Sequence, residues 1–181
     1  MILVGFMGAG KSSVGRALAD QLGWTFEDLD DRIEQREGRT LPEIFRDSGE
    51  VGFRRAEHKA LKQLMEELQA APKKIVALGG GAFVQKENAR LIEAEGIPTV
   101  FLDAEVDKLW RRCRQQAERG GIERPLWGSL ERFGELYEAR RRYYLKASFR
   151  QETDGKTIQE IATEVVEALG LNRRREKRGE K

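Results

Sequence analysis

The sequence is short of the residues that build disulfides, metal clusters and membrane spans. Its 181 residues include one cysteine, Cys113, and one histidine, His58. A single cysteine excludes an internal disulfide, and we expect a reducing, cytoplasmic setting. No stretch approaches the roughly 18 apolar residues of a membrane-spanning helix, and the apolar start Met1–Met7 lacks the basic region of a secretory signal. We therefore expect neither a membrane partner nor export.

An excess of charge of one sign is also missing. Charged residues make up 35% of the chain, yet the formal net charge is only +2. Residues 173–181 carry six basic and two acidic residues, which leaves 27 basic and 29 acidic residues in residues 1–172. Since the body offers no matching basic surface, we interpret 173–181 as a solvated, disordered tail and expect no nucleic-acid partner. Residues 1–172 are expected to form one domain, because that length suits a single hydrophobic core.

Short β-rich runs alternate with longer amphipathic runs along the chain. The strands are predicted at Ile2–Phe6, Thr25–Glu27, Lys74–Leu78, Thr99–Leu102 and Phe149–Thr153. The helices are predicted at Lys11–Leu22, Asp31–Glu37, Leu41–Phe45, Phe53–Gln69, Glu87–Glu95, Val106–Glu118, Leu130–Lys146 and Ile158–Leu169. This alternation predicts an α/β fold in which helices cover both faces of a parallel sheet and ligands bind at the carboxyl ends of the strands.

Helix ends are marked by glycines and by capping pairs. A glycine follows four of the predicted helices, at Gly23, Gly38, Gly96 and Gly170. A left-handed residue is favoured at that position. Thr40 with Glu43, and Thr157 with Glu160, have the capping-box spacing of a helix start.

A glycine-rich loop follows the first predicted strand. Gly5-Phe-Met-Gly-Ala-Gly10-Lys11-Ser12 satisfies the pattern G-x-x-x-x-G-K-S/T and lies between a strand and a helix. In this arrangement backbone amides and the helix N-terminus bind phosphate oxygens, the lysine reaches the β- and γ-phosphates, and the hydroxyl binds Mg²⁺. The motif predicts that the chain binds a nucleoside triphosphate.

The loop alone does not say what the nucleotide is used for. A GTPase would be expected to carry N-K-x-D, but asparagine occurs only at Asn88 and Asn172, and neither position begins that motif. A motor ATPase usually has a strand that ends in an acidic residue, whereas the strand KKIVAL ends in Gly79–Gly81. A kinase for a small molecule is compatible with both observations.

Two carboxylates follow the second predicted strand. Asp28 and Asp30 are alternate residues, so in an extended segment both side chains would face one cleft. One carboxylate could organise Mg²⁺ while the other accepts a proton from an attacking hydroxyl. The alternative is that Asp30 or Asp31 only caps the helix that follows.

Arg54 and Glu57 begin the next long helix. An arginine at a helix start opposes the helix dipole and gains more from binding an anion, so Arg54 is a candidate clamp for a substrate carboxylate. A surface salt bridge with Glu50 or Glu57 is the alternative. His58 is treated as incidental, because phosphoryl transfer to an alcohol does not require it.

Three further segments have a composition suited to a ligand site. Gly79–Gly81 would let the backbone approach a ligand closely. The loop ERGGIERPLW suits a mobile lid, at about residues 113–128, that brings Arg124 over the transferring phosphate. Three consecutive arginines, Arg140–Arg142, occur in a helix, where at most one or two can face the cleft.

Taken together and in order, these motifs resemble shikimate kinase. That family has a loop of the form G-x-M-G-x-G-K-S/T, an Asp-x-Asp, F-R-x-x-E, G-G-G, R-P-L and R-x-x-x-Y. The corresponding segments here are Gly5–Ser12, Asp28–Asp30, Phe53–Glu57, Gly79–Gly81, Arg124–Leu126 and Arg140–Tyr144, which span most of the chain.

The resemblance implies a three-layer, nucleoside-monophosphate-kinase-like fold with a five-stranded parallel sheet and a mobile lid. It also implies transfer of the γ-phosphate of ATP to the 3-hydroxyl of shikimate, on the route to chorismate and the aromatic amino acids. ATP and Mg²⁺ are the implied cofactors. A monomer is expected, because no apolar stripe exceeds what the core needs.

The resemblance also implies a role for each matching residue. Asp30 would bind the shikimate hydroxyls and act as the base, with Lys11 and Arg124 stabilising charge on the phosphoryl group. Arg54 and Arg140 would hold the carboxylate, near Gly79, Gly80 and Gly81 and supported by Glu57. The nucleotide would be bound by Gly8, Ala9, Gly10, Lys11, Ser12, Ser13, Arg112 and Arg124, and Mg²⁺ by Ser12 and Asp28. The adenine-side arginine stays open among Arg112, Arg114 and Arg119, with Arg112 favoured, and Arg140 depends on counting back from Tyr144.

Three other functions would also use a phosphate-binding loop. Another small-molecule kinase, such as a gluconate kinase, would also use an arginine for a hydroxylated carboxylate. A non-catalytic nucleotide-binding protein would be expected to lack Lys11, Asp30 or Arg124, and this chain has all three. An ATPase acting on nucleic acid is disfavoured by the acidic balance of residues 1–172.

Overall fold

The fold is known from a computed structural model that describes residues 1–118 and 128–171. Its centre is a sheet of five parallel strands in the order β2-β3-β1-β4-β5. The strands are β1 (Ile2–Val4), β2 (Thr25–Asp28), β3 (Lys74–Ala77), β4 (Thr99–Asp103) and β5 (Phe149–Glu152). The predicted five-stranded parallel sheet is therefore confirmed.

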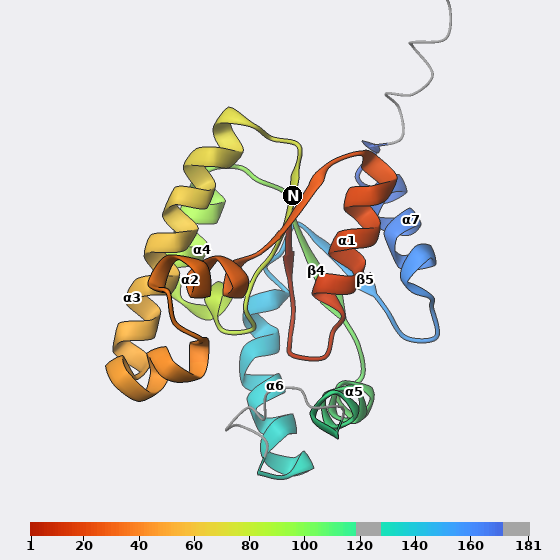
Figure 1. The fold of residues 1–181 in the computed structure, drawn as a ribbon. Helices are drawn as coiled ribbons and strands as arrows, with labels where there is room; N and C mark the ends of the chain where they lie inside the picture. The colour runs from red at the N-terminus through yellow and green to blue at the C-terminus, as the bar shows by residue number, and fades with distance from the viewer. Residues whose placement is uncertain (119–127, 172–181) are drawn as a thin grey trace, which may run out of the picture.

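Helices cover both faces of this sheet (Figure 1). The helices are α1 (Lys11–Leu22), α2 (Leu29–Glu37), α3 (Leu41–Ala70), α4 (Lys86–Ala94), α5 (Val106–Glu118), α6 (Leu130–Tyr144) and α7 (Ile158–Ala168), with a short 3₁₀ turn, η1 (Ala82–Val84). Figure 1 shows α1 and α7 on one side, α3 and α4 on the other, and α5 near the end where β1 turns into α1.

The helix-end signals of the sequence are reproduced in the structure. Gly23, Gly38, Gly96 and Gly170 all have left-handed backbone angles, with φ of 66°, 63°, 60° and 64°. In both capping boxes the glutamate carboxylate accepts a hydrogen bond from the threonine backbone N–H, at 2.8 Å for Glu43 and 2.7 Å for Glu160. These local signals place helix boundaries because they satisfy amides and carbonyls that have no partner within the helix.

Two predicted helices are neighbouring segments of one element, separated by a non-helical residue. The segments expected at Leu41–Phe45 and Phe53–Gln69 belong to the single long element α3, which is interrupted by a kink at Gly49. Gly49 has φ 64° and ψ −176°, a conformation open to glycine and costly for other residues. The kink therefore joins two helical segments that the sequence presents as separate.

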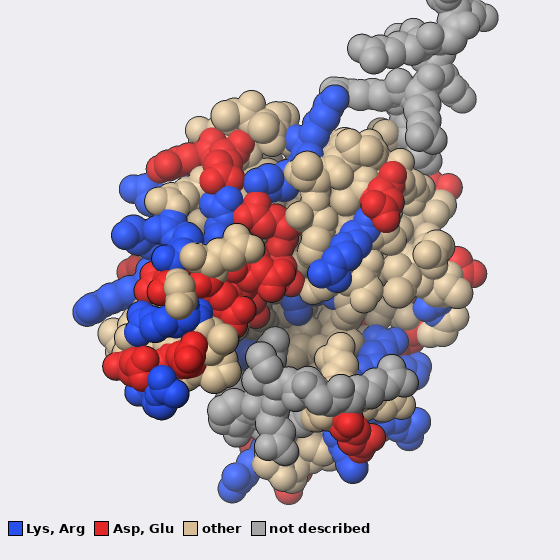
Figure 2. All heavy atoms as spheres, in the orientation of Figure 1, with Lys and Arg blue, Asp and Glu red and all other residues tan. Residues whose placement is uncertain are grey.

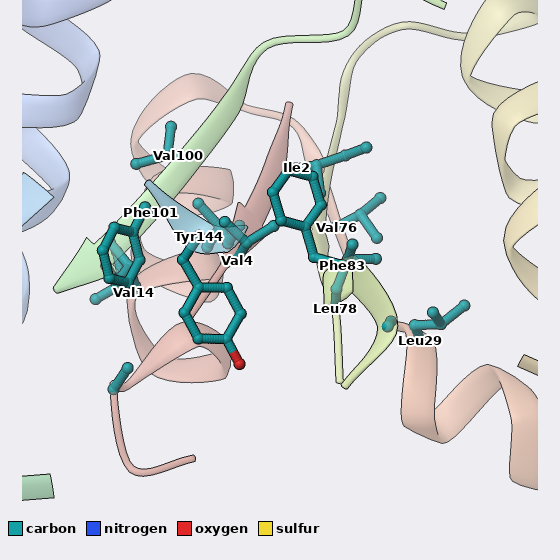
Figure 3. Packing of buried hydrophobic residues seen from close by; sticks show 14 of the residues in the cluster. Ile2, Val4, Val14, Leu29, Val76, Leu78, Phe83, Val100, Phe101 and Tyr144 are labelled. Carbon is teal, nitrogen blue, oxygen red and sulfur yellow. The ribbon is translucent and has the colours of Figure 1, made fainter. Parts of the chain in front are cut away.

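The hydrophobic core lies between the strands and the helices on each face. Figure 3 shows apolar side chains from three central strands packed together, among them Ile2, Val76 and Val100. Each of these three side chains is fully buried. Such continuous apolar runs are typical of parallel strands that are covered on both faces. The core fixes the strand order, and the strand order fixes which loops meet at the carboxyl edge.

The surface is highly charged. Figure 2 shows acidic side chains gathered over α2 and the neighbouring β2, with basic side chains interspersed over α3. Within residues 1–118 and 128–171, no helix is long and apolar enough to cross a membrane.

Candidate active site

The phosphate-binding loop connects β1 to α1 at the carboxyl edge of the sheet. Gly8 and Gly10 have left-handed φ angles of 79° and 83°, and Gly10 occupies the position just before α1. The Lys11 ammonium donates hydrogen bonds to the carbonyl oxygens of Gly5 (2.9 Å) and Phe6 (3.0 Å). The lysine thus lies across its own loop, with its charge held where the phosphates of a nucleotide would sit.

Helix α5 packs directly against this loop. A Cβ atom on Gly8 would lie 2.8 Å from the Leu109 carbonyl oxygen and 2.9 Å from the Cys113 sulfur. Arg112, on the same helix, donates a hydrogen bond to the Gly8 carbonyl oxygen at 3.4 Å. The close approach of α5 explains the need for glycine at position 8 and brings the Arg112 guanidinium beside the loop.

The structure separates two of the three arginines considered for the adenine. Arg114 pairs with Glu118 of its own helix at 3.6 Å, and both side chains are exposed. Arg112 is the one in contact with the phosphate loop. Arg119 lies outside the described residues.

Ser12 and Asp28 form the first polar pair of the site. The Ser12 hydroxyl donates a hydrogen bond to Asp28 Oδ2 at 2.7 Å, linking the start of α1 to the end of β2. The other Asp28 oxygen accepts a hydrogen bond from the Asp30 backbone N–H at 3.1 Å, so Asp28 caps α2. One carboxylate therefore both begins a helix and faces the phosphate loop.

The expectation of an extended Asp28–Asp30 segment was wrong. Helix α2 starts at Leu29, so Asp30 lies in its first turn and the capping residue is Asp28, not Asp30 or Asp31. The reason is that a carboxylate placed just before a helix satisfies free backbone N–H groups. Asp28 and Asp30 consequently take different neighbours, Ser12 for Asp28 and Gly79 for Asp30.

Arg54 and Glu57 form a partly buried ion pair on α3. Arg54 Nη1 donates to both Glu57 oxygens, at 3.1 and 3.0 Å, and Nη2 donates to Glu50 at 3.3 Å. The Glu57 side chain is 1% exposed. Burial raises the pKa of the Glu57 carboxyl, while the charges of Arg54 and Arg140 oppose the rise. The salt bridges weighed as an alternative for Arg54 are thus formed.

These ion pairs do not use the whole guanidinium of Arg54. Within the part of the chain that the structure describes, its Nε atom is buried and has no hydrogen-bond partner. The side chain lies over the Phe53 ring, with 5.0 Å between the guanidinium carbon and the ring centroid. Glu57 and Phe53 therefore fix the direction of a guanidinium that can still donate a hydrogen bond.

Two of the three glycines after β3 face the charged side chains of the site. A Cβ on Gly79 would lie 2.5 Å from Asp30 Oδ1, and a Cβ on Gly81 would lie 2.7 Å from Arg54 Nη2. Both distances are shorter than van der Waals contact. Neither glycine has a positive φ, so a larger residue is opposed here by close approach rather than by backbone conformation, and the end of the charged side chain would have to shift to admit it.

The middle glycine faces helix α6. A Cβ on Gly80 would lie 3.6 Å from Arg140 Nη1, and the Gly80 carbonyl oxygen accepts a hydrogen bond from the Tyr144 hydroxyl. Burial raises the pKa of Tyr144 to about 12. The guanidinium of Arg140 also lies over the Phe6 ring of the phosphate loop, 5.8 Å from its centroid. The glycines thus bring together Asp30, Arg54 and Arg140, from three helices far apart in sequence.

Only one of the three consecutive arginines faces this site. Arg141 Nη2 donates to Asp103 Oδ2 at 2.9 Å on the other side of α6, and Arg142 contacts the neighbouring Tyr143. Arg140 is the arginine that lies beside Gly80. The count back from Tyr144 therefore selects the residue that the fold places at the glycines.

The sequence did not reveal what holds α6 in place. Asp103, at the end of β4 and 5% exposed, accepts hydrogen bonds from Tyr137 (2.6 Å), Arg141 (2.9 Å) and Arg150 (2.8 Å). Burial alone would raise the pKa of Asp103, but these hydrogen bonds and charges lower it below its ordinary value. An acidic residue at the carboxyl end of a strand was the available signal. The network fixes the helix that carries Arg140.

His58 has a structural role in the described chain. Its Nδ1 lies 2.7 Å from Asn88 Oδ1, and Asn88 Nδ2 donates to the Ala82 carbonyl oxygen at 3.1 Å. These bonds link α3 and α4 to the turn that follows the three glycines. Its interpretation as incidental to the chemistry remains a prediction.

Several predicted features lie outside the described residues. These are Arg124 with Pro125 and Leu126, most of the expected lid, and the tail 173–181. The first part of the expected lid, residues 113–118, is the end of α5.

The close approach of Gly79 to Asp30 leads to a first test. We expect Gly79→Ala to lower kcat by about 100-fold, because the new Cβ would push the carboxylate away and a displacement of about 1 Å is enough for such a loss. Gly134→Ala on α6 is the matched control, since among the described residues its Cβ would meet only Val106, at 3.9 Å. The control should keep full activity. Steady-state kinetics and thermal unfolding of both variants provide the measurement. Full activity in Gly79→Ala would contradict the assignment of Asp30 to the active site.

Comparison with known proteins bears directly on this arrangement. The family model described as shikimate kinase matches residues 7–170. A shikimate kinase of Thermus thermophilus is 41% identical over 170 residues, covering 92% of this chain and 88% of that protein. One from Persephonella marina is 37% identical over 165 residues, covering 91% of this chain and 94% of that protein.

Solved structures agree in fold. Shikimate kinase from Acinetobacter baumannii in complex with shikimate superposes with a TM-score of 0.82 at 32% identity, covering 94% of this chain and 92% of that chain. A gluconokinase from Sinorhizobium meliloti reaches only 0.57 at 21% identity, which shows a shared fold and nothing more. Together with the P-loop, the glycine cluster and the converging arginines, these matches show that the chain belongs to the shikimate kinase family.

Proposed function

We propose that this chain transfers the γ-phosphate of ATP to the 3-hydroxyl of shikimate, giving shikimate 3-phosphate for the synthesis of chorismate and the aromatic amino acids. The observation that carries the proposal is the convergence of Asp30, Arg54 and Arg140 on Gly79–Gly81, next to the phosphate-binding loop. Two guanidinium groups and a carboxylate surround a backbone segment without side chains. This arrangement suits an acceptor that has one carboxylate and several hydroxyls.

We assign a role in this reaction to each described residue of the site. Arg54 and Arg140 would hold the shikimate carboxylate, and Glu57 positions Arg54 from its buried side. Asp30 would accept the proton of the 3-hydroxyl as that oxygen attacks the γ-phosphorus and ADP leaves. Lys11 would stabilise the charge that develops on the phosphoryl oxygens. We assign the same task to Arg124 from the motif alone.

The nucleotide would be bound by the phosphate-binding loop and the start of α1. Gly8, Ala9, Gly10, Lys11, Ser12 and Ser13 supply backbone N–H groups and side chains at the start of α1, where the helix dipole favours phosphate. Arg112 donates a hydrogen bond to Gly8 of that loop and is assigned to the adenine side.

Ser12 and Asp28 fit a magnesium ion. A hydroxyl and a carboxylate 2.7 Å apart are oxygen donors of the kind that Mg²⁺ prefers, and protein sites commonly supply one or two such groups while phosphates and water supply the rest. Within the described residues no group of three or more His, Cys, Asp and Glu side chains is placed to hold a metal without the nucleotide. A bound ion would neutralise charge on the β- and γ-phosphates.

Asp28→Asn tests the metal assignment. Asparagine is as good a helix cap as aspartate, so α2 should remain capped while the negative charge is lost. We expect the free Mg²⁺ concentration for half-maximal activity to rise about tenfold or more, with little change in the thermal unfolding temperature. Titration of ADP with and without Mg²⁺ gives a second readout, since only the Mg²⁺-dependent part of ADP affinity should fall. Equal Mg²⁺ dependence in variant and parent would remove Asp28 from the metal site.

A coupled ADP-release assay tests the reaction itself. Purified chain, ATP and Mg²⁺ are compared with shikimate, with gluconate and without acceptor. We expect turnover with shikimate and only background with gluconate. Turnover with gluconate and none with shikimate would overturn the proposal in favour of a gluconate kinase.

We also propose that the enzyme acts as a monomer in the cytoplasm. The single, buried cysteine and the absence of an apolar stripe beyond core needs support this proposal. Sedimentation at assay concentration should give one species near the chain mass of 20.7 kDa.

A further inference from the structure

A second hollow lies away from the catalytic residues. It has a volume of about 580 Å³ and is enclosed by η1, α4, the end of α6 and the starts of β4 and β5. Thr99 and Ser148 lie at the amino ends of β4 and β5, so this part of the wall is at the edge opposite the phosphate loop, while η1 follows the carboxyl end of β3. A volume of this size is typical of small-molecule sites.

None of the described residues assigned to the reaction lines this cavity. Asp30, Arg54 and Arg140 are absent from its wall, and so is the whole phosphate-binding loop. The wall nevertheless continues from the site, because Gly79–Gly81 lead directly into η1. The cavity is therefore a separate space next to the elements that carry the acceptor site.

The floor of the cavity is apolar. Phe83 and Ile92 are almost fully buried and belong to the hydrophobic core, while Val84 and Ile97 are partly buried against it. Figure 3 shows Phe83 among the core side chains that surround the central strands. A floor held by the core keeps its shape, and it offers a flat apolar surface to the body of a ligand.

The rim of the cavity is basic. Lys86 and Arg90 extend from α4, Lys146 follows α6, and Glu93 is the one carboxylate among the described residues of the rim. Within the part of the chain that the structure describes, none of the three cations forms an ion pair with a carboxylate. Lys146 instead lies over the Tyr143 ring, 5.6 Å from its centroid.

Among the described residues, Arg32, Lys74 and Arg141 are each held by one or two carboxylates, whereas exposed cations such as Lys59 and Lys62 form no ion pair, like the three at this cavity. Three cations without such partners around one apolar cavity produce a local positive potential that attracts an anion.

We propose that this cavity is a second ligand site, which binds a small organic anion. Its carboxylate or phosphate group would be held by Lys86, Arg90 and Lys146, and its apolar body would lie on Phe83, Val84 and Ile97. The hydroxyls of Tyr143 and Ser148 are further polar groups on the wall.

The test uses benzoate and phenylphosphonate as probes on the ¹⁵N-labelled full chain. Saturating ADP first fills the nucleotide site, so that phenylphosphonate is not drawn to the phosphate loop, and ionic strength is held constant. We expect saturable shifts of the backbone amides of η1, α4, Thr99 and Ser148. Acetate and methylphosphonate, which lack the ring, should bind more weakly. A stronger response to one ring-bearing probe identifies its head group as the preferred one.

Charge-matched double variants make the test specific. Lys86→Gln with Lys146→Gln should weaken probe binding about tenfold, since each exposed ionic contact contributes modestly. Lys59→Gln with Lys62→Gln removes the same charge from exposed positions of α3 that do not line the cavity, and should leave binding unchanged. Arg90→Gln provides an independent second variant.

Three results would overturn the proposal. The first is shifts that do not saturate. The second is shifts confined to the phosphate loop and to Gly79–Gly81. The third is an equal loss of affinity in the two double variants, which would mean that net charge alone attracts the probes.

Discussion

Asp30→Asn is expected to lower kcat for shikimate phosphorylation by about 10²- to 10⁴-fold while leaving ATP binding nearly unchanged. A positioned general base contributes about that factor, and an amide cannot accept the proton of the attacking hydroxyl. Asparagine has almost the same shape, so the packing of the carboxylate against Gly79 should be preserved. Steady-state kinetics give kcat, and a nucleotide titration gives the affinity.

Asp31→Asn is the matched control for this substitution. Asp31 lies next to Asp30 in the first turn of α2, but its side chain is exposed, whereas Asp30 is partly buried beside Gly79. The control removes the same charge from the same turn and should change kcat by less than about threefold, as is usual for surface positions. If the two variants had equal turnover, Asp30 would lose its assignment as the base.

Arg140→Ala is expected to raise KM for shikimate by about 10- to 100-fold with little effect on KM for ATP. A hydrogen bond to a charged group contributes about 1.5–3 kcal/mol, and each 1.4 kcal/mol is a factor of ten. The truncation should be tolerated by the fold, because alanine is a strong helix former and Arg140 lies within α6. The hydrogen bonds of Asp103 with Tyr137 and Arg141 do not involve Arg140, whereas Tyr144 interacts with Arg140 as well as with Gly80.

An acceptor without the carboxylate sharpens this prediction. If Arg140 binds that group, the parent and Arg140→Ala should use the carboxamide analogue of shikimate with similar KM values. Arg142→Ala is the matched control, since Arg142 is exposed and contacts only Tyr143 among the described residues. An equal penalty with shikimate and with the carboxamide would show that Arg140 acts through structure and not through the carboxylate.

The acceptor side of the site depends on close backbone approach. Gly79 and Gly81 lie so near Asp30 and Arg54 that a methyl group at either position would collide with the charged side chain. The Gly80 carbonyl oxygen accepts a hydrogen bond from the Tyr144 hydroxyl, and Gly80 lies beside Arg140. The three glycines therefore set the distances between one carboxylate and two guanidinium groups.

Local signals in the sequence were enough for the elements and the donor loop. The bounds predicted for the helices Lys11–Leu22 and Val106–Glu118 match α1 and α5. The left-handed conformation of the four glycines at helix ends was also predicted, and so were the two capping boxes. Each of these features depends on residues within one helical turn. The phosphate loop belongs to the same class, since its backbone, lysine and serine are contiguous.

The prediction of which way side chains point was less accurate where a strand ends and a helix begins. Asp28 and Asp30 were placed on one face of an extended segment, but α2 starts between them and separates their neighbours. The two helices predicted on either side of Gly49 were correct, because a non-helical residue separates two helical segments within α3. For Asp28 and Asp30, the extended conformation was outweighed by the capping of α2 by Asp28.

By itself, the sequence determined the α/β class, the nucleotide loop and the set of charged residues available to an acceptor. Only the tertiary structure decided the strand order and the pairing of each glycine after β3 with one charged side chain, and it agrees with the count from Tyr144 in placing Arg140 beside Gly80. The physical reason is range. Capping, turn and loop geometry arise from neighbours along the chain, whereas the acceptor site arises where α2, α3 and α6 meet at one edge of a sheet whose order is fixed by core packing.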